Sequence, residues 1–254
     1  MSEERVVKVV TLPEEFRGRR VGLLELLLRD RQEVRLKHNF WFVTGIETIN
    51  SLLPYIRGWN AKTQLNGGYD LAWQEFMDWL RDEQGEPLLG DWYVKPLQEC
   101  QGDHEKVALM FLDQVARYVE RFGLTPRGRA GAMDERIAAT HGPLPREWGG
   151  RQVGLMDALL WLHQRMNEGQ DLSVLTGLDT VDSLYCFTMG WIRNSIYNEL
   201  EEPGWEPFLD WLRDVKKEFP GQGWHVKYLE DCQGDHRKAT LKYLDFAAGF
   251  LSSR

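Results

Sequence analysis

The sequence predicts a mainly α-helical protein built from two tandem homologous modules of about four helices each. Apolar residues recur at spacings of three and four over several stretches, which is the period of an amphipathic helix. The chain also matches itself at a constant offset of 132 residues without any insertion, so that residues 12–122 align with 144–254, and 41 of these 111 pairs are identical. Two copies that share this much sequence are expected to share one fold.

The composition is that of an ordinary globular protein. Of the 254 residues, 43% are hydrophobic and 28% are charged, which excludes bulk disorder. A chain of this length buries a sizeable core without support from metals or disulfides.

The repeat divides the chain into a first helical module at 1–122, a linker at 123–143 and a second helical module at 144–254. The linker segment is rich in Gly, Pro and Arg at its ends and has no long apolar period. The segment before residue 12 alternates apolar residues weakly. We therefore expect a short strand or an extended arm at the N-terminus of each module.

The first helix of each module is predicted at 21–35 and 153–168, where apolar residues follow the helical period.

The second helix of the first module is predicted to begin at Thr44. Thr44 and Glu47 have the spacing of a capping box, and Thr176 and Asp179 form a shorter version of it in the second module. Pro54 falls within the apolar run after Glu47. We expect it to kink the helix, because proline removes a backbone hydrogen bond inside a helix.

The third helix of each module carries an aromatic run, and the chain contains 11 tryptophans in all. Large rings of this kind fill the space between helices, and they also anchor binding interfaces. Trp73 and Trp79 are six residues apart, so both rings cannot lie at the centre of one narrow helix face. We expect most of the tryptophans to lie in the core and one of this pair to be partly exposed.

The fourth helix of each module comes after the pentapeptide Cys-Gln-Gly-Asp-His, which occurs at 100–104 and again at 232–236. A thiol, a carboxylate and an imidazole within five residues can make a metal site or a Cys/His nucleophile pair. The metal ligands in this interpretation are Asp103, His104, Asp235 and His236. A metal site of this kind would make the protein a metal-dependent hydrolase.

A tight junction between two helices explains the same pentapeptide. Gly102 would take the left-handed conformation that ends a helix. Asp103 would cap the next helix, and Cys100 would be a small buried residue. We favour this interpretation, since one mechanism accounts for three of the five residues, and we expect no cofactor.

The charge balance argues against a general nucleic-acid-binding protein. Lys and Arg number 31 against 39 Asp and Glu, which gives a net charge of −8, whereas affinity for nucleic acid comes from cationic side chains. This balance still allows a local basic patch within residues 17–37. The cationic residues within 17–37 are Arg17, Arg19, Arg20, Arg29, Arg31, Arg35 and Lys37.

The three cysteines, Cys100, Cys186 and Cys232, cannot all pair and have no C-x-x-C spacing, so we expect reduced thiols. The N-terminal segment has no apolar signal region, and no apolar run approaches the length of a membrane span. We expect a cytoplasmic protein that does not bind membranes.

The segment 198–206 is acidic, whereas its counterpart 66–74 is nearly neutral. Residues 131–254 carry 13 basic and 19 acidic side chains, against 18 and 20 in residues 1–130. A negative face with a tryptophan at its edge suits the docking of a basic protein. The binding residues predicted on this basis are Glu199, Glu201, Glu202, Trp205, Glu206 and Trp73.

These observations favour a non-catalytic binding or inhibitory protein that acts on a partner with a basic surface. Immunity proteins that neutralise toxins have this character. The alternatives are the metal-dependent hydrolase described above and a structural scaffold. The sequence leaves the oligomeric state and the identity of the partner open.

Overall fold

The computed structural model describes residues 12–37, 41–84, 92–125, 148, 151–170, 179–218 and 223–253. Within these ranges the chain is all-helical and contains no strand, which confirms the predicted mainly α class. The predicted arm or strand before residue 12 lies outside the described residues. The same holds for residues 126–143 of the predicted linker.

The chain has a first half, residues 12–122, and a second half, residues 144–254, which align at the offset of 132. The helices of the first half are α1 (Leu23–Lys37), α2 (Trp41–Thr44), α3 (Leu52–Leu65), α4 (Leu71–Gln84), α5 (Val94–Glu99) and α6 (His104–Phe122). Short 3₁₀ turns lie at Glu14–Phe16 and Ile49–Ser51.

The helices of the second half are α8 (Leu155–Asn167), α10 (Val181–Tyr197), α11 (Trp205–Trp211), α12 (Trp224–Asp231) and α13 (His236–Ser252). A π-helical turn at Leu212–Lys216 extends α11.

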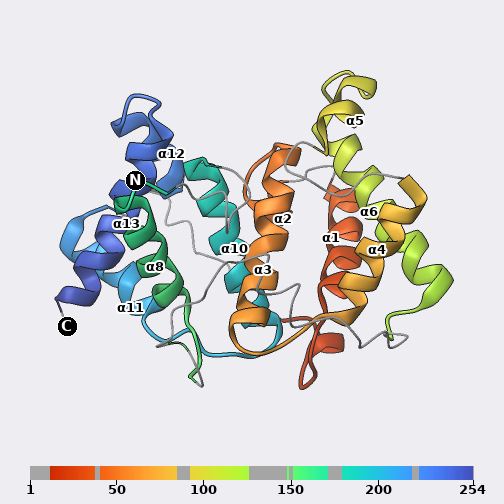
Figure 1. Cartoon of the computed structure of the whole chain (residues 1–254), viewed down its shortest axis with the longest axis horizontal. Helices are drawn as coiled ribbons and strands as arrows, with labels where there is room; N and C mark the ends of the chain where they lie inside the picture. The colour runs from red at the N-terminus through yellow and green to blue at the C-terminus, as the bar shows by residue number, and fades with distance from the viewer. Residues whose placement is uncertain are drawn as a thin grey trace, which may run out of the picture.

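Two long helices, α3 and α10, lie side by side at the centre of the molecule (Figure 1). The other long helices of the first half lie on one side of this pair, and those of the second half lie on the other side (Figure 1). Among the described helices, no other pair packs together as extensively as α3 and α10. These two helices occupy equivalent places in the two aligned segments.

Two glycines allow α3 and α10 to approach closely. A Cβ atom on Gly58 would overlap the carbonyl oxygen of Phe187, and a Cβ atom on Gly190 would overlap the carbonyl oxygen of Tyr55. Tyr55 and Phe187 are 132 residues apart, as are Gly58 and Gly190. The two contacts are therefore reciprocal.

Two asparagines form a second reciprocal contact between the halves. Asn66, at the C-terminal end of α3, accepts a hydrogen bond from the backbone N–H of Val153 at 2.8 Å. Asn198, at the end of α10, accepts one from the backbone N–H of Val21 at 2.8 Å. Each central helix thus ends on the segment that leads into the first long helix of the other half.

The apolar core consists of two clusters, one centred on each half. The clusters reach across the boundary, because Cys186 and Tyr197 of α10 belong to the first cluster and Ala61 of α3 belongs to the second. Trp59 and Trp191, the equivalent tryptophans of the central helices, are both fully buried. The core is rich in aromatic rings, as the sequence predicts.

The predicted start of the second helix is wrong in the first half. Thr44 ends the short helix α2, and α3 begins only at Leu52. Gly45 explains the difference, because its φ of +78° breaks the helix directly after Thr44. The Thr44 hydroxyl bonds to the Ile46 carbonyl at 2.8 Å, and so does not cap a helix after it.

Pro54 also differs from the expected kink. It lies in the first turn of α3, where a proline is tolerated because the backbone N–H there has no partner within the helix. In the second half, α10 is capped by Thr180, whose hydroxyl accepts from the backbone N–H of Ser183 at 3.1 Å. Thr176 lies outside the described residues, and Asp179 lies just before this cap.

Candidate functional site

The two Cys-Gln-Gly-Asp-His segments form tight turns between α5 and α6 and between α12 and α13. The short helices α5 and α12 protrude at the same edge of the molecule (Figure 1). In the first turn, Gly102 has φ +85°, Cys100 is 8% exposed, and the Asp103 carboxylate accepts from the backbone N–H of Lys106 at 2.9 Å. The predicted junction geometry is confirmed.

The second turn repeats this geometry. Gly234 has φ +84°, and the Asp235 carboxylate accepts from the backbone N–H of Lys238 at 3.0 Å. This hydrogen bond lowers the pKa of Asp235, because it favours the charged carboxylate. The glutamines before the glycines, Gln101 and Gln233, also have positive φ, at 58° and 56°.

The two histidines of the pentapeptides begin α6 and α13. His104 accepts a hydrogen bond through Nδ1 from the backbone N–H of Ile49 at 3.2 Å, which connects the turn to the approach to α3. Within the part of the chain that the structure describes, no three His, Cys, Asp or Glu side chains lie together as metal ligands would. The geometry at Asp103 and Asp235 is that of helix caps.

The acidic segment 198–206, here called the acidic loop, connects α10 to α11. Glu202 lies at its centre with a side chain that is 8% exposed, and it forms an ion pair with Lys62 of the first half. Its carboxylate accepts from the Trp191 indole at 2.8 Å, the Ser195 hydroxyl at 2.7 Å and the backbone N–H of Leu155 at 2.8 Å. Glu202 therefore anchors the loop, whereas the sequence predicts that it contacts a partner.

Glu199 ties the beginning of the acidic loop to the first half. It has φ 52°, and its carboxylate accepts from the backbone N–H of Gly18 at 3.3 Å. The Glu201 carbonyl accepts from the side chain of Gln152 at 3.5 Å, while the side chains of Glu201 and Glu206 are exposed. The carboxylates of the loop that face solvent are thus held on a fixed backbone.

The two predicted tryptophans are placed differently. Trp205 is half-buried and packs on Phe208, with ring centroids 6.1 Å apart. Trp73 is only 5% exposed and packs on Phe76 in the core of the first half, so its ring does not form a surface. Trp79 is the more exposed of the pair on α4, as expected from their spacing.

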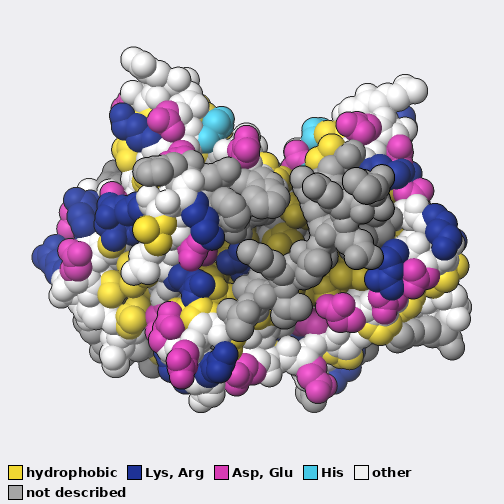
Figure 2. All heavy atoms as spheres, turned by 180° about the vertical axis from the view of Figure 1, so that it is seen from behind, with side chains coloured by type: hydrophobic (Ala, Val, Ile, Leu, Met, Phe, Trp, Pro, Cys, Tyr) yellow, Lys and Arg dark blue, Asp and Glu magenta, His cyan; other side chains and the backbone are white. Residues whose placement is uncertain are grey.

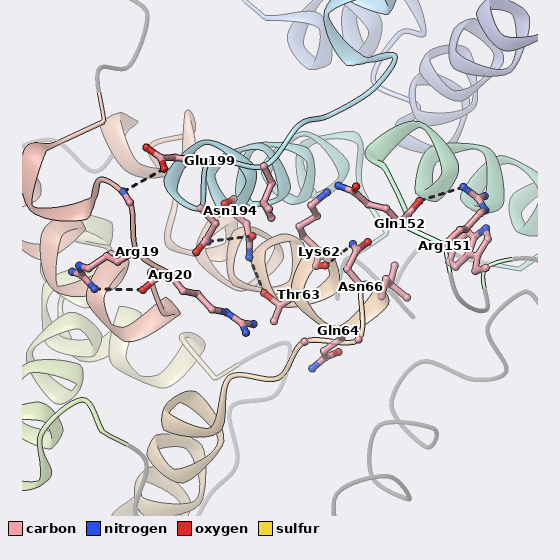
Figure 3. A pocket seen from close by; sticks show the side chains of 17 residues that line it. Arg19, Arg20, Lys62, Thr63, Gln64, Asn66, Arg151, Gln152, Asn194 and Glu199 are labelled. Atoms are coloured by element: carbon pink, nitrogen blue, oxygen red, sulfur yellow. Dashed lines mark hydrogen bonds between the residues drawn. The ribbon is translucent and has the colours of Figure 1, made fainter.

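A cavity of about 1260 Å³ lies between the two halves, next to the acidic loop (Figure 3). It is here called the interface cavity. Its polar lining includes Arg19, Arg20, Lys62, Arg151, Asn194 and Glu199. The sequence does not predict this cavity. A signal is present in Arg19 and Arg20 of the basic stretch, but the internal alignment does not show that this stretch faces the second half.

A buried charged group also lies at the boundary of the halves. Asp30 of α1 is 1% exposed, and its carboxylate lies 3.6 Å from the guanidinium of Arg193 on α10. The Tyr55 hydroxyl donates to Asp30 at 3.3 Å. Burial raises the pKa of Asp30 to about 6, although Arg193 and Tyr55 act in the opposite direction.

Comparison of the chain with models of protein families, with curated proteins and with solved structures gives no match. None of the described helices has both the length and the apolar character needed to cross a membrane.

Proposed function

We propose that the protein is a non-catalytic binding protein of the toxin-neutralising type, which holds a partner with a basic surface through the acidic loop. The observation that carries this proposal is the set of solvent-facing carboxylates on a firmly anchored loop. Glu199, Glu201 and Glu206 are exposed, whereas the Glu202 side chain is only 8% exposed and fixes the backbone between them.

An anchored loop favours binding because little conformational entropy is lost when the partner docks. Exposed carboxylates on a protein of net charge −8 also attract a basic partner over a distance and accelerate the encounter. Charges of both signs are interspersed over the face shown in Figure 2. The acidic loop is therefore a better candidate for recognising the basic partner than the overall charge of the protein.

The proposal includes an origin by duplication, in which the halves are two copies of one helical module. Equivalent hydrogen bonds support it. The backbone N–H of Leu23 donates to Asp70 at 2.7 Å, and that of Leu155 donates to Glu202 at 2.8 Å. These donors and acceptors are each related by the offset of 132. The reciprocal contacts of Gly58 and Gly190 support an approximate two-fold relation.

A cytoplasmic location belongs to the same proposal. Cys100, Cys186 and Cys232 are all free thiols. Burial raises the pKa of Cys186 well above its usual range, which keeps this thiol protonated and unreactive.

The test is capture of the partner by the purified protein at low and high salt. We expect a basic protein that is retained at low ionic strength and released as salt screens the exposed charges. A double variant, Glu201→Lys with Glu206→Lys, should lose most of this binding. Glu120→Lys, a change of the same kind on an exposed residue of α6, should retain it.

Capture of an acidic partner would contradict the proposal. Equal binding by the double variant and by the Glu120→Lys control would contradict it as well.

A further inference from the structure

We propose that the interface cavity binds a small anion that carries at least two phosphate or carboxylate groups. The inference goes beyond the proposed function. It concerns the cavity and its arginines, whereas the partner is assigned to the exposed carboxylates of the acidic loop, of which Glu199 alone also lines the cavity.

The charge of the lining is opposite to that of the protein. The net charge of the chain is −8, yet the described lining of the cavity has four cationic side chains, Arg19, Arg20, Lys62 and Arg151, and one carboxylate, Glu199. Arg19, Lys62 and Arg151 are each paired with a carboxylate outside the lining, namely Glu25, Glu202 and Asp157. Cationic side chains in a concave surface attract ligands of the opposite sign. Arg20, which has no such partner among the described residues, is therefore the group on which binding of an anion would depend.

Two of the arginines are held in place by ion pairs with carboxylates that lie outside the cavity lining. Arg19 forms an ion pair with Glu25 at 2.7 Å, and Arg151 forms a two-pronged pair with Asp157 at 2.8 and 2.9 Å. Both side chains remain partly exposed. The exposed fraction is 43% for the Arg19 side chain and 46% for the Arg151 side chain. Arg19 and Arg151 are equivalent residues of the two halves, and they flank the cavity from opposite sides (Figure 3).

Arg20 is the cation available to a ligand. Its side chain is exposed, extends into the cavity, and makes no hydrogen bond or ion pair with any described residue (Figure 3). It passes over Gly68, where a Cβ atom would lie 2.7 Å from Nη2 of Arg20. The equivalent residues of the second half are Gln152 and Leu200, so this arrangement occurs on one side only.

The floor of the cavity is built from buried polar side chains. Asn194 is 3% exposed and donates to the Trp59 carbonyl at 2.9 Å and to the Thr63 hydroxyl at 2.8 Å. Lys62 is 1% exposed and forms its ion pair with Glu202. These bonds fix the floor, so the site is formed before a ligand enters.

The size and chemistry of the cavity define the class of ligand. Its volume of about 1260 Å³ accommodates a ligand of nucleotide size with several waters. The planar guanidinium group donates two parallel hydrogen bonds to phosphate or carboxylate. Arg20 supplies such a group, and the partly exposed, ion-paired side chains of Arg19 and Arg151 lie at the two flanks, so the site fits an anion with separated charges.

The experiment measures binding of ATP, pyrophosphate and citrate to the full-length protein by calorimetry, with chloride as the screening salt. Phosphate and carboxylate ligands are thereby distinguished. We expect one of the three to bind one to one and to raise the melting temperature. Arg20→Gln should weaken this binding about tenfold without lowering the melting temperature of the free protein, because the Arg20 side chain makes no bond to the described chain.

Arg81→Gln is the matched control, since Arg81 is an exposed arginine of α4 outside the cavity. It should leave binding unchanged, and Arg20→Lys should retain part of it. Absence of binding by all three anions at millimolar concentration would overturn the proposal. Equal weakening by Arg20→Gln and Arg81→Gln would also overturn it. Binding of the anion in the Glu201→Lys, Glu206→Lys variant should be intact, which separates this test from that of the partner.

Discussion

At the scale of single residues, Asp30 shows how a buried charge affects the stability of this protein. It lies between the halves with Arg193 and the Tyr55 hydroxyl as neighbours, and burial raises its pKa from 3.8 to about 6. The folded state therefore holds the Asp30 proton more tightly than the unfolded state between these pH values.

This raised pKa sets the sign of the pH dependence. The contribution of Asp30 is most favourable below about pH 4, and it is lost as pH rises through about 6, because the ionised carboxylate must then be buried. The total change is on the order of 3 kcal/mol. We expect the difference in unfolding free energy between the wild type and Asp30→Asn to fall over this range. Urea unfolding of both proteins at several pH values measures this difference. If the unfolding free energies of the wild type and the variant change in parallel with pH, the pH dependence does not come from Asp30.

The cap residue Asp103 provides a prediction that separates the junction from a metal site. Asp103→Ala should lower the unfolding free energy by about 1 kcal/mol, because the backbone N–H of Lys106 loses its acceptor. Stability measured with and without divalent metal should be the same. If added metal stabilises the wild type and not the variant, Asp103 is a ligand and the cap interpretation fails.

Local chemistry makes these junction residues predictable. Gly102 and Asp103 act within one turn, so their roles follow from neighbouring sequence. The role of Glu202 does not, because its cation, Lys62, is supplied by the other half. The burial of Trp73 is also a consequence of packing between helices, which the helical period alone does not fix.

At the scale of helices, the crossing of α3 and α10 depends on the two central glycines. A Cβ atom at Gly190 would overlap the Tyr55 carbonyl, which belongs to the helix backbone and cannot rotate away. Glycine in a helix normally reduces stability relative to alanine. The close approach of α3 and α10 explains why glycine is present at both equivalent positions.

We predict that Gly190→Ala and Gly58→Ala each destabilise the protein by about 2 kcal/mol or more, since the helices must separate to make room. Gly249→Ala is the control. Gly249 lies in α13 with its nearest contact at 3.8 Å, so alanine should be neutral or stabilising by up to about 1 kcal/mol there. Thermal unfolding of the three variants tests this, and equal melting temperatures would show that the crossing tolerates a side chain.

The helix starts illustrate the limit of sequence patterns at this scale. The existence and period of the long helices are predicted correctly, whereas the start at Thr44 is wrong. A Thr-x-x-Glu spacing predicts a cap only where the next residues can continue the helix, and Gly45 with its positive φ prevents this. In the second half the cap is Thr180, four residues after Thr176, the equivalent of Thr44.

At the scale of the whole molecule, the halves form one unit through reciprocal contacts. Gly58 and Gly190 contact each other's helices, and Asn66 and Asn198 each bind the backbone of the opposite half. The internal alignment predicts that the halves resemble one another. It does not predict which faces meet, because a repeat in sequence carries no information about the symmetry that relates its copies.

The interface cavity could not be predicted from the sequence for the same reason. Its lining comes from both halves, and it exists only once the central helices are paired. The sequence shows that Arg19 and Arg20 belong to a basic stretch, and the structure adds that they line one cavity with Arg151 and Asn194 of the other half.

We propose that the repeat in the sequence is also a repeat in packing, which joins the halves through α3 and α10. The most direct test introduces a protease site within residues 126–143, cuts the folded protein once, and measures the size of the product in solution. We predict that both fragments stay together at the size of the uncut chain, and that Gly58→Ala and Gly190→Ala loosen them equally. Separation of the two fragments as independently folded proteins would contradict the claim.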